Sequence, residues 1–138
     1  PQIPTIDSVS VSFNDAVIGW QPSTSPDVIG YVIYQYINGI WTAIDTVFGI
    51  NNTSYVNLIS NAGAQSEDYV IAAFDSCGNI SAFSPSHQSL FVYLQLNICD
   101  AEMNINWNSY VNMAPALSGY EVYVSENGGP FLLLGTTP

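Results

Sequence analysis

The sequence predicts an all-β protein with an immunoglobulin-like β-sandwich, present as one complete module followed by part of a second. Three observations support this prediction. Apolar residues alternate in short runs without helical periodicity. Turn residues recur about every 8–12 positions. Four features of the first half return in the same order in the second half. About seven short strands within about 94 residues are typical of such a sandwich.

The first four strands are expected within residues 6–48. A loop follows the second strand, because two prolines and several hydroxyl or acidic residues stand close together in residues 21–27. Asn38-Gly39, between the third and fourth strands, is a strong hairpin signal. The expected strands cover residues 6–13, 17–20, 31–35 and 41–48.

Three further strands are expected over residues 53–59, 69–74 and 80–94. Turn residues at 61–64 separate the fifth strand from the sixth, and residues 75–79 close the sixth. Ser84-Pro85 interrupts the seventh. Because proline cannot donate to a hydrogen-bond ladder, this last strand is expected at a sheet edge or with a bulge.

The second half of the chain repeats the first, and Trp107 follows Trp20 by 87 residues, about the length of one sandwich domain. The repeat predicts a complete domain over residues 1–94 and the N-terminal half of a second domain over residues 95–138. The matched pairs are Trp20 with Trp107, Gly30-Tyr31-Val32-Ile33-Tyr34 with Gly119-Tyr120-Glu121-Val122-Tyr123, Asn38-Gly39 with Asn127-Gly128, and Trp41 with Phe131.

The second copy ends before its last strands. Half a sandwich leaves an apolar face and open strand edges, and we do not expect it to be stable alone. We expect one of two completions: the polypeptide continues past Pro138, or a neighbouring molecule supplies the missing strands and the protein is a fibre subunit. The side chains expected to be partly exposed are Trp107, Tyr120, Val122, Tyr123, Phe131 and Leu133.

The charge of the chain excludes two classes of partner. It has 11 acidic residues, no Lys or Arg, and a net charge of −11. Without a basic patch it has nothing to neutralise a phosphate backbone, so nucleic acid is excluded as a partner. Attraction to an anionic membrane is excluded for the same reason. No run of 18 apolar residues occurs, so membrane insertion is not expected.

Three motifs resemble those of fibronectin type III domains: Trp20, Gly30-Tyr31-x-Ile33-Tyr34, and Tyr69-x-Ile71-x-Ala73-x-Asp75-x-x-Gly78-Asn79-x-Ser81. The variant at residues 75–79, followed by His87 and Cys99, is similar to fibronectin type III-like repeats of large secreted surface proteins of the Bacteroidetes. Those repeats are associated with gliding motility and type IX secretion. The resemblance implies an extracellular or cell-surface location and a structural or adhesive role. The expected partners are neighbouring modules of the same chain, further copies of the protein, and glycans.

No constellation for catalysis is visible, so we expect no enzyme, no catalytic residue and no cofactor. His87 is the only histidine, and no G-x-S-x-G nucleophile elbow occurs. The chain has too few His and Cys residues to form a metal site from them, and no EF-hand loop is present. A calcium ion held between modules by loop carboxylates stays open as an alternative.

Aromatic residues divide into two groups. Five of them match buried positions of the sandwich and are expected in the core: Trp20, Tyr31, Tyr34, Tyr69 and Trp107. Three others stand beside turns and are candidates for stacking against a ligand: Tyr36, Trp41 and Tyr55. The alternative function is therefore a carbohydrate-binding or spacer module of a secreted polysaccharide-degrading enzyme, which predicts that Tyr36 and Trp41 are exposed and coplanar.

Cys77 and Cys99 are a candidate disulfide, since disulfides persist outside the cell. The predicted topology separates them, because Cys77 follows the sixth strand and Cys99 follows the seventh. A bond needs Cα atoms within about 7 Å, so an intramolecular bond, an intermolecular bond and free thiols all stay open. Candidate N-glycosylation positions are Asn51, Asn52 and Asn79, and the family resemblance adds Ser8 and Thr46 as candidates for O-glycosylation.

Overall fold

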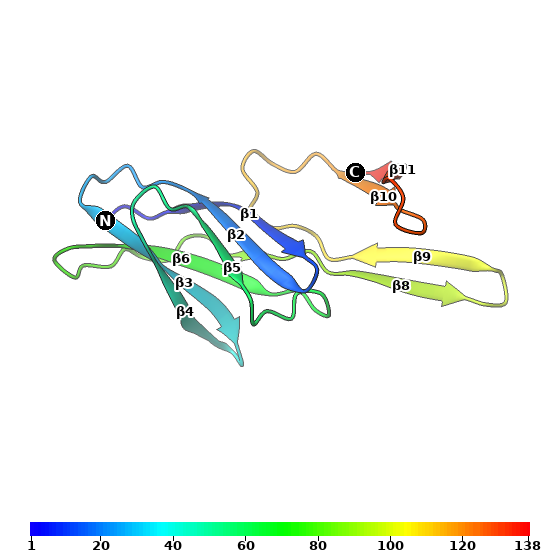
Figure 1. Cartoon of the computed structure of the whole chain (residues 1–138), viewed down its shortest axis with the longest axis horizontal. Coiled ribbons are helices and arrows are strands. Elements are labelled where there is room, and N and C mark those ends of the chain that lie inside the picture. The colour runs from blue at the N-terminus through cyan, green and yellow to red at the C-terminus, as the bar shows by residue number, and fades with distance from the viewer.

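The computed structural model describes residues 1–138 and contains eleven strands. The molecule is elongated, with a two-layer sandwich of β1–β7 at one end and two hairpins, β8–β9 and β10–β11, at the other (Figure 1). No helix of the structure is long and apolar enough to cross a membrane. The all-β sandwich predicted from the sequence is confirmed.

The sandwich consists of two antiparallel sheets. The first has the order β1-β2-β5 and the second the order β4-β3-β6-β7. Their strands are β1 (Thr5–Ser12), β2 (Asp15–Gln21), β3 (Val28–Ile37), β4 (Ile40–Phe48), β5 (Ser54–Asn57), β6 (Asp68–Asp75) and β7 (His87–Gln88).

The core lies between the two sheets and follows from the alternation in the sequence. Trp20 on β2 is 2% exposed, and Tyr31 on β3 is fully buried. Their rings meet edge to face, with centroids 5.3 Å apart, a preferred arrangement for aromatic pairs. The other large side chains of the core come from β1, β2, β3 and β6: Ile6, Ile18, Ile33, Tyr69 and Ile71.

The β3–β4 hairpin and the hairpin of its repeat, residues 120–137, share two backbone features. Asn38 and Gly39 have φ values of 52° and 85°, and Asn127 and Gly128 have 51° and 74°. Two consecutive residues with positive φ are what a two-residue hairpin turn of the primed type requires, and Asn-Gly tolerates them best. The pairing register also shifts between Ile33 and Tyr34, and again between Val122 and Tyr123. The two copies of the internal repeat therefore also share their backbone conformation at the turn and at the register shift.

The seventh strand differs from the expectation of one run over residues 80–94. Only His87–Gln88 pair regularly with β6. Elsewhere three serines each bind one residue of β6 or the residue just before it through two hydrogen bonds. The serine backbone N–H donates to the carbonyl of that residue, and the serine Oγ accepts its N–H: Ser81 with Ala73, Ser84 with Ile71, and Ser89 with Glu67. We call these contacts the serine clips. They satisfy the β6 backbone where the Ser84-Pro85 break prevents a regular ladder.

The second part of the molecule contains four strands in two hairpins. These are β8 (Val92–Asn97) with β9 (Glu102–Trp107), and β10 (Tyr120–Val124) with β11 (Leu132–Thr137). The end of the expected seventh strand thus belongs to β8, which also runs across the expected domain boundary at residues 94 and 95. No strand equivalent to β5, β6 or β7 is present in this part.

Candidate binding surfaces and the joint between the modules

The single histidine lies in the joint between the two parts of the chain. His87 is 2% exposed, and its Nδ1 is 3.3 Å from the Tyr110 hydroxyl oxygen. The Tyr110 hydroxyl also accepts the backbone N–H of Val9 at 2.7 Å. Burial lowers the pKa of His87, and the carboxylate of Asp7 opposes that effect. Burial therefore favours the neutral form of the ring.

The segment after β9 binds back to the end of the first module. Asn108 donates from Nδ2 to the Gln88 side chain at 3.0 Å and to the Ser89 carbonyl at 3.1 Å, and its Oδ1 accepts the Phe91 N–H at 2.7 Å. Asn112 donates to the Ser86 carbonyl at 2.6 Å. Together with Tyr110, these contacts connect the second part of the chain to β1 and to residues 86–91. We call this set of contacts the joint.

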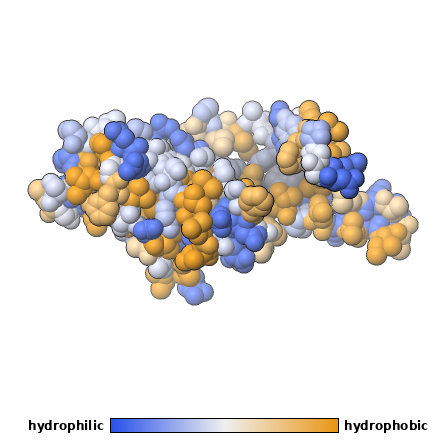
Figure 2. Space-filling view, in the orientation of Figure 1, coloured by the Kyte–Doolittle hydropathy of each residue, from blue (hydrophilic) through white to orange (hydrophobic).

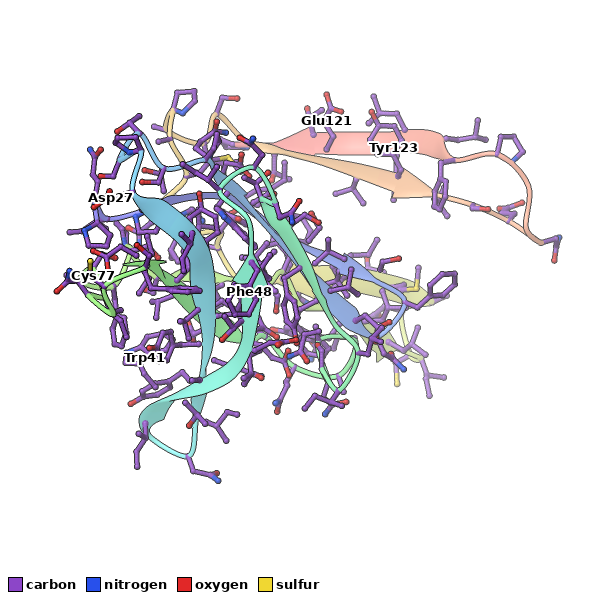
Figure 3. The ribbon with its side chains drawn as sticks, turned by 60° about the vertical axis from the view of Figure 1, so that its left-hand side comes forward. Asp27, Trp41, Phe48, Cys77, Glu121 and Tyr123 are labelled. Atoms are coloured by element: carbon purple, nitrogen blue, oxygen red, sulfur yellow. The ribbon has the colours of Figure 1, made fainter.

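Two of the three candidate stacking residues lie together. The rings of Tyr36 and Trp41 have centroids 5.0 Å apart and planes inclined at 57°, so they are not coplanar. Phe83 extends the group, with its centroid 6.4 Å from Trp41 and 4.7 Å from Tyr34. These four rings, the aromatic cluster, lie on the outer face of the β4-β3-β6-β7 sheet, and Figure 3 shows Trp41 there.

The aromatic cluster also covers part of the sheet. Val70 pairs with Tyr34 across β3 and β6, so both side chains are on the outer face, and Val70 is only 2% exposed. Tyr36 and Phe83 nevertheless stay 48% and 43% exposed. The cluster thus has a packing role on its inner side and a free aromatic surface on its outer side.

Tyr55 does not belong to this cluster. It lies on β5 in the opposite sheet and packs partly against the core. Burial raises its pKa, and the neighbouring carboxylate of Asp45 adds to the effect. Sequence reasoning included Tyr55 because it stands beside a turn, and missed Phe83 because the segment around it was expected to be an ordinary strand.

The two cysteines are far apart. Cys77 lies in the loop after β6, at the end of the sandwich where the N-terminus also lies, and Cys99 lies in the β8–β9 turn at the opposite end of the molecule (Figures 1 and 3). Both thiols are exposed and free. The structure therefore does not bring this candidate pair together.

The candidate glycosylation residues are spread over several loops and strands. Asn52 donates from Nδ2 to the Phe48 carbonyl at 2.6 Å, and Asn79 donates to the Asp75 carboxylate at 2.7 Å. The Asn79 contacts lower the pKa of Asp75. Asn51 and Thr46 are exposed, and Ser8 is half-buried beside Asp7. No group of three or more His, Cys, Asp or Glu side chains lies together as a metal site.

A hollow of about 330 Å³ opens between the β8–β9 and β10–β11 hairpins, and eight of its nine lining residues are hydrophobic. Trp107 and Tyr120 meet across it, with centroids 5.5 Å apart. Phe131 is 74% exposed and Leu133 is 55% exposed. Figure 2 shows hydrophobic side chains exposed over these hairpins as well as around the β3–β4 hairpin.

Comparison with known proteins identifies the fold. No protein-family model and no curated protein matches the sequence. A fibronectin type III-like protein from Clostridium thermocellum matches 70% of this chain over 98% of its own length, with 20% identity and a TM-score of 0.53. A β-1,2-glucanase from Parabacteroides distasonis matches 61% of this chain over only 12% of its own length, with 20% identity and a TM-score of 0.52. The sandwich therefore has a fibronectin type III-like fold.

Proposed function

We propose that this chain, whose complete sandwich is fibronectin type III-like, is a non-catalytic structural module of a large secreted or cell-surface protein. The observation that carries the proposal is the joint. Six hydrogen bonds or polar contacts of Asn108, Tyr110 and Asn112 connect the second part of the chain to the first. A fixed angle between successive modules is what a spacer or an adhesive stalk needs, because it holds distant parts apart without bending.

The chemistry of the surface agrees with this role. The only histidine is enclosed in the joint, where its ring contacts Tyr110 rather than a Ser or Cys side chain. The sequence resemblance at residues 75–79, His87 and Cys99 supports a role in surface proteins of the type associated with gliding motility and type IX secretion. We propose that location, together with glycans on some of the candidate positions, for this protein.

Small-angle X-ray scattering tests the structural role. The wild-type chain is expected to fit one fixed arrangement of its two parts. A Tyr110→Phe, Asn108→Ala double variant is expected to require a range of arrangements, while the circular dichroism of the sandwich stays unchanged. A wild-type protein as flexible as the double variant would contradict a role as a rigid spacer.

The aromatic cluster favours a second candidate function, carbohydrate binding as an accessory module. Rings inclined at 57° and 62° form a cradle rather than a flat platform, which suits a soluble glycan chain better than a flat crystalline surface. The absence of cationic side chains favours neutral glycans over acidic ones. Affinity electrophoresis through gels of neutral polysaccharides tests it: retardation is expected for wild type and lost in Trp41→Ala. Phe48→Ala, which removes another exposed aromatic ring of the same face, is the control.

A further inference from the structure

The joint contains one side chain that can change its charge near neutral pH, the imidazole of His87. The ring is 2% exposed, and its Nδ1 lies 3.3 Å from the Tyr110 hydroxyl oxygen. Histidine is the side chain whose ordinary pKa puts its change of charge roughly between pH 5 and pH 8. A proton taken up by this ring therefore arrives inside the contact between the two parts of the chain.

The Tyr110 hydroxyl connects His87 to β1 because it both accepts and donates a hydrogen bond. Its oxygen accepts the backbone N–H of Val9 at 2.7 Å, so its own proton is free to be donated. The Nδ1 of His87 is the acceptor within reach of that proton. A ring nitrogen accepts only when it carries no proton. The contact therefore requires the neutral ring, with its proton on Nε2.

Tyr110 is also held from the second part of the chain. Its backbone N–H donates to the Tyr120 hydroxyl at 2.8 Å, and the Tyr120 ring packs against Trp107. Tyr120 lies on β10 and Trp107 lies on β9. A single residue thus connects both hairpins of the second part to β1 and β7 of the sandwich.

The other hydrogen bonds of the joint lie close to the covalent connection between the two parts. Asn108 and Asn112 bond only to residues 86–91, the stretch that leads into β8. Among the hydrogen bonds of the joint, only that of Tyr110 reaches β1. A contact away from the connection fixes the angle between the two parts, whereas contacts beside the connection act as a pivot.

We propose that the joint is a pH-sensitive hinge, in which a proton on His87 releases Tyr110 and lets the second part of the chain pivot about Asn108. This inference rests on the proposed rigid joint and names the condition that controls it. A protonated Nδ1 donates instead of accepting, so the Tyr110 hydroxyl proton loses its acceptor. The charge is also buried, and burying an unpaired charge is unfavourable. Opening the joint admits water to the ring, so protonation favours the open form.

The charges around the ring do not compensate a proton inside the closed joint. The chain has no Lys or Arg, so every other charged side chain is acidic. Asp7 on β1 attracts the protonated ring. It is exposed, however, and its carboxylate oxygens accept from Gln21 at 2.5 Å and from Ser8 at 3.1 Å rather than from the ring. Its attraction is therefore weakened by water and salt.

Strand β6 and the residue before it carry the remaining titratable groups beside β7. Tyr69 lies opposite His87, and its hydroxyl donates to the Glu67 carboxylate at 2.6 Å. Asp68 lies opposite Gln88 and accepts from its side chain at 3.4 Å. Neither carboxylate bonds to the histidine ring. Burial lowers the pKa of His87 despite the attraction of Asp7, as expected for a closed joint that disfavours the proton.

The two cysteines provide a direct measurement of the angle. Cys77 and Cys99 are free and exposed, and they lie at opposite ends of the molecule with the joint between them (Figures 1 and 3). Double electron–electron resonance between nitroxide labels on these residues gives the distribution of their distances in the full chain. A narrow distribution is expected at pH 8 and a broader one at pH 5.5, while the circular dichroism of the sandwich stays unchanged. A distribution that is narrow at both pH values overturns the hinge.

His87→Gln is the matched control, because glutamine keeps a hydrogen-bonding side chain that does not titrate. Its distribution is expected to stay narrow at pH 5.5. Broadening equal to that of the wild type would assign the effect to carboxylates and overturn the proposal. If the variant does not fold, the wild type decides, since its only histidine gives one Hε1 resonance. The midpoint of the broadening is expected to coincide with the midpoint of that titration, and separate midpoints also overturn the proposal.

The hinge and the proposed function fail in different ways. A wild-type distribution that is already broad at pH 8 contradicts the rigid spacer, whereas one that is narrow at both pH values leaves the spacer and removes only the hinge. Tyr110→Phe lacks the hydroxyl and is expected to be broad at both pH values. A narrow distribution for Tyr110→Phe would show that Asn108 and Asn112 fix the angle, and it would overturn the part given to Tyr110.

Discussion

The rings of Trp107 and Tyr120 meet edge to face with centroids 5.5 Å apart and planes at 63°, nearly the geometry of Trp20 and Tyr31 at 5.3 Å and 65°. The second part of the chain thus has the same aromatic pair at the centre of its core as the first. The two pairs differ in how far they are buried from solvent. Trp20 is 2% exposed, whereas Trp107 and Tyr120 are only half-buried.

This difference in burial predicts that the same substitution lowers the free energy of unfolding by different amounts at the two tryptophans. Trp20→Ala is expected to lower the free energy of unfolding by about 3–5 kcal/mol, because it empties a filled core. Trp107→Ala is expected to cost less than about half as much, because its ring still contacts solvent. Urea denaturation followed by circular dichroism measures both. Equal costs would mean that the second core is as well covered as the first.

The joint predicts a dependence of stability on pH. Burial lowers the pKa of His87 in the folded protein below its ordinary value of about 6.5. The unfolded chain therefore binds the proton more readily. The stabilising contribution of the neutral ring is fully present above about pH 6.5, and it is lost as the pH falls through the folded pKa. Urea midpoints between pH 8 and pH 5.5 are expected to fall in the wild type. His87→Gln, which has no titrating ring, is expected to show a flatter profile.

The hydroxyl of Tyr110 predicts a second effect at the joint. Tyr110→Phe leaves the Val9 N–H without the acceptor that it reaches at 2.7 Å. An unsatisfied, part-buried donor costs about 1–3 kcal/mol. Tyr123→Phe is the matched control, because its hydroxyl bonds only to the exposed Glu121, and a change below about 0.5 kcal/mol is expected there. Thermal and urea unfolding of the two variants compare them directly. If Tyr123→Phe lost as much stability as Tyr110→Phe, the effect of Tyr110→Phe could not be attributed to its hydrogen bond at the joint.

The serine clips predict that one hydroxyl group supports the edge of the second sheet. Ser84 is 5% exposed, and its Oγ accepts the N–H of Ile71 at 3.1 Å. Ser84→Ala is expected to cost about 1–3 kcal/mol and to speed amide exchange at Ile71. Ser12→Ala, at an exposed position of β1, is expected to change stability by less than about 0.5 kcal/mol. Unchanged exchange at Ile71 in Ser84→Ala would show that water replaces the hydroxyl.

Local sequence patterns were enough to predict most of the fold. Alternation predicted the inward residues of β2 and of β3 as far as Ile33, and Asn38-Gly39 predicted the hairpin turn, because both signals act over a few residues. Tyr34, which was expected in the core, lies instead on the outer face against Phe83, because its neighbour Ile33 faces the core and successive side chains of a strand point to opposite faces. The seventh strand was not predicted correctly. Its pairing depends on seryl hydroxyl groups that reach β6 from a broken backbone, and serine has no strand preference that reveals such a contact.

The candidate site was predicted only in part. Tyr36 and Trp41 come together because a two-residue turn pairs them across β3 and β4, which the sequence indicates. Phe83 joins them from a segment more than forty residues later, and Tyr110 reaches His87 from beyond β9. Contacts between residues so far apart depend on how the elements pack, and no local pattern carries that information.

The serine clips also bear on how such a chain avoids aggregation. A regular edge strand offers evenly spaced donors and acceptors on which any other extended polypeptide can add. Along residues 80–89 the seryl hydroxyls already accept the N–H groups of Glu67, Ile71 and Ala73. Pro85 interrupts the outer edge with a residue that has no N–H. This rim of the sandwich therefore offers no regular template for amyloid-like stacking.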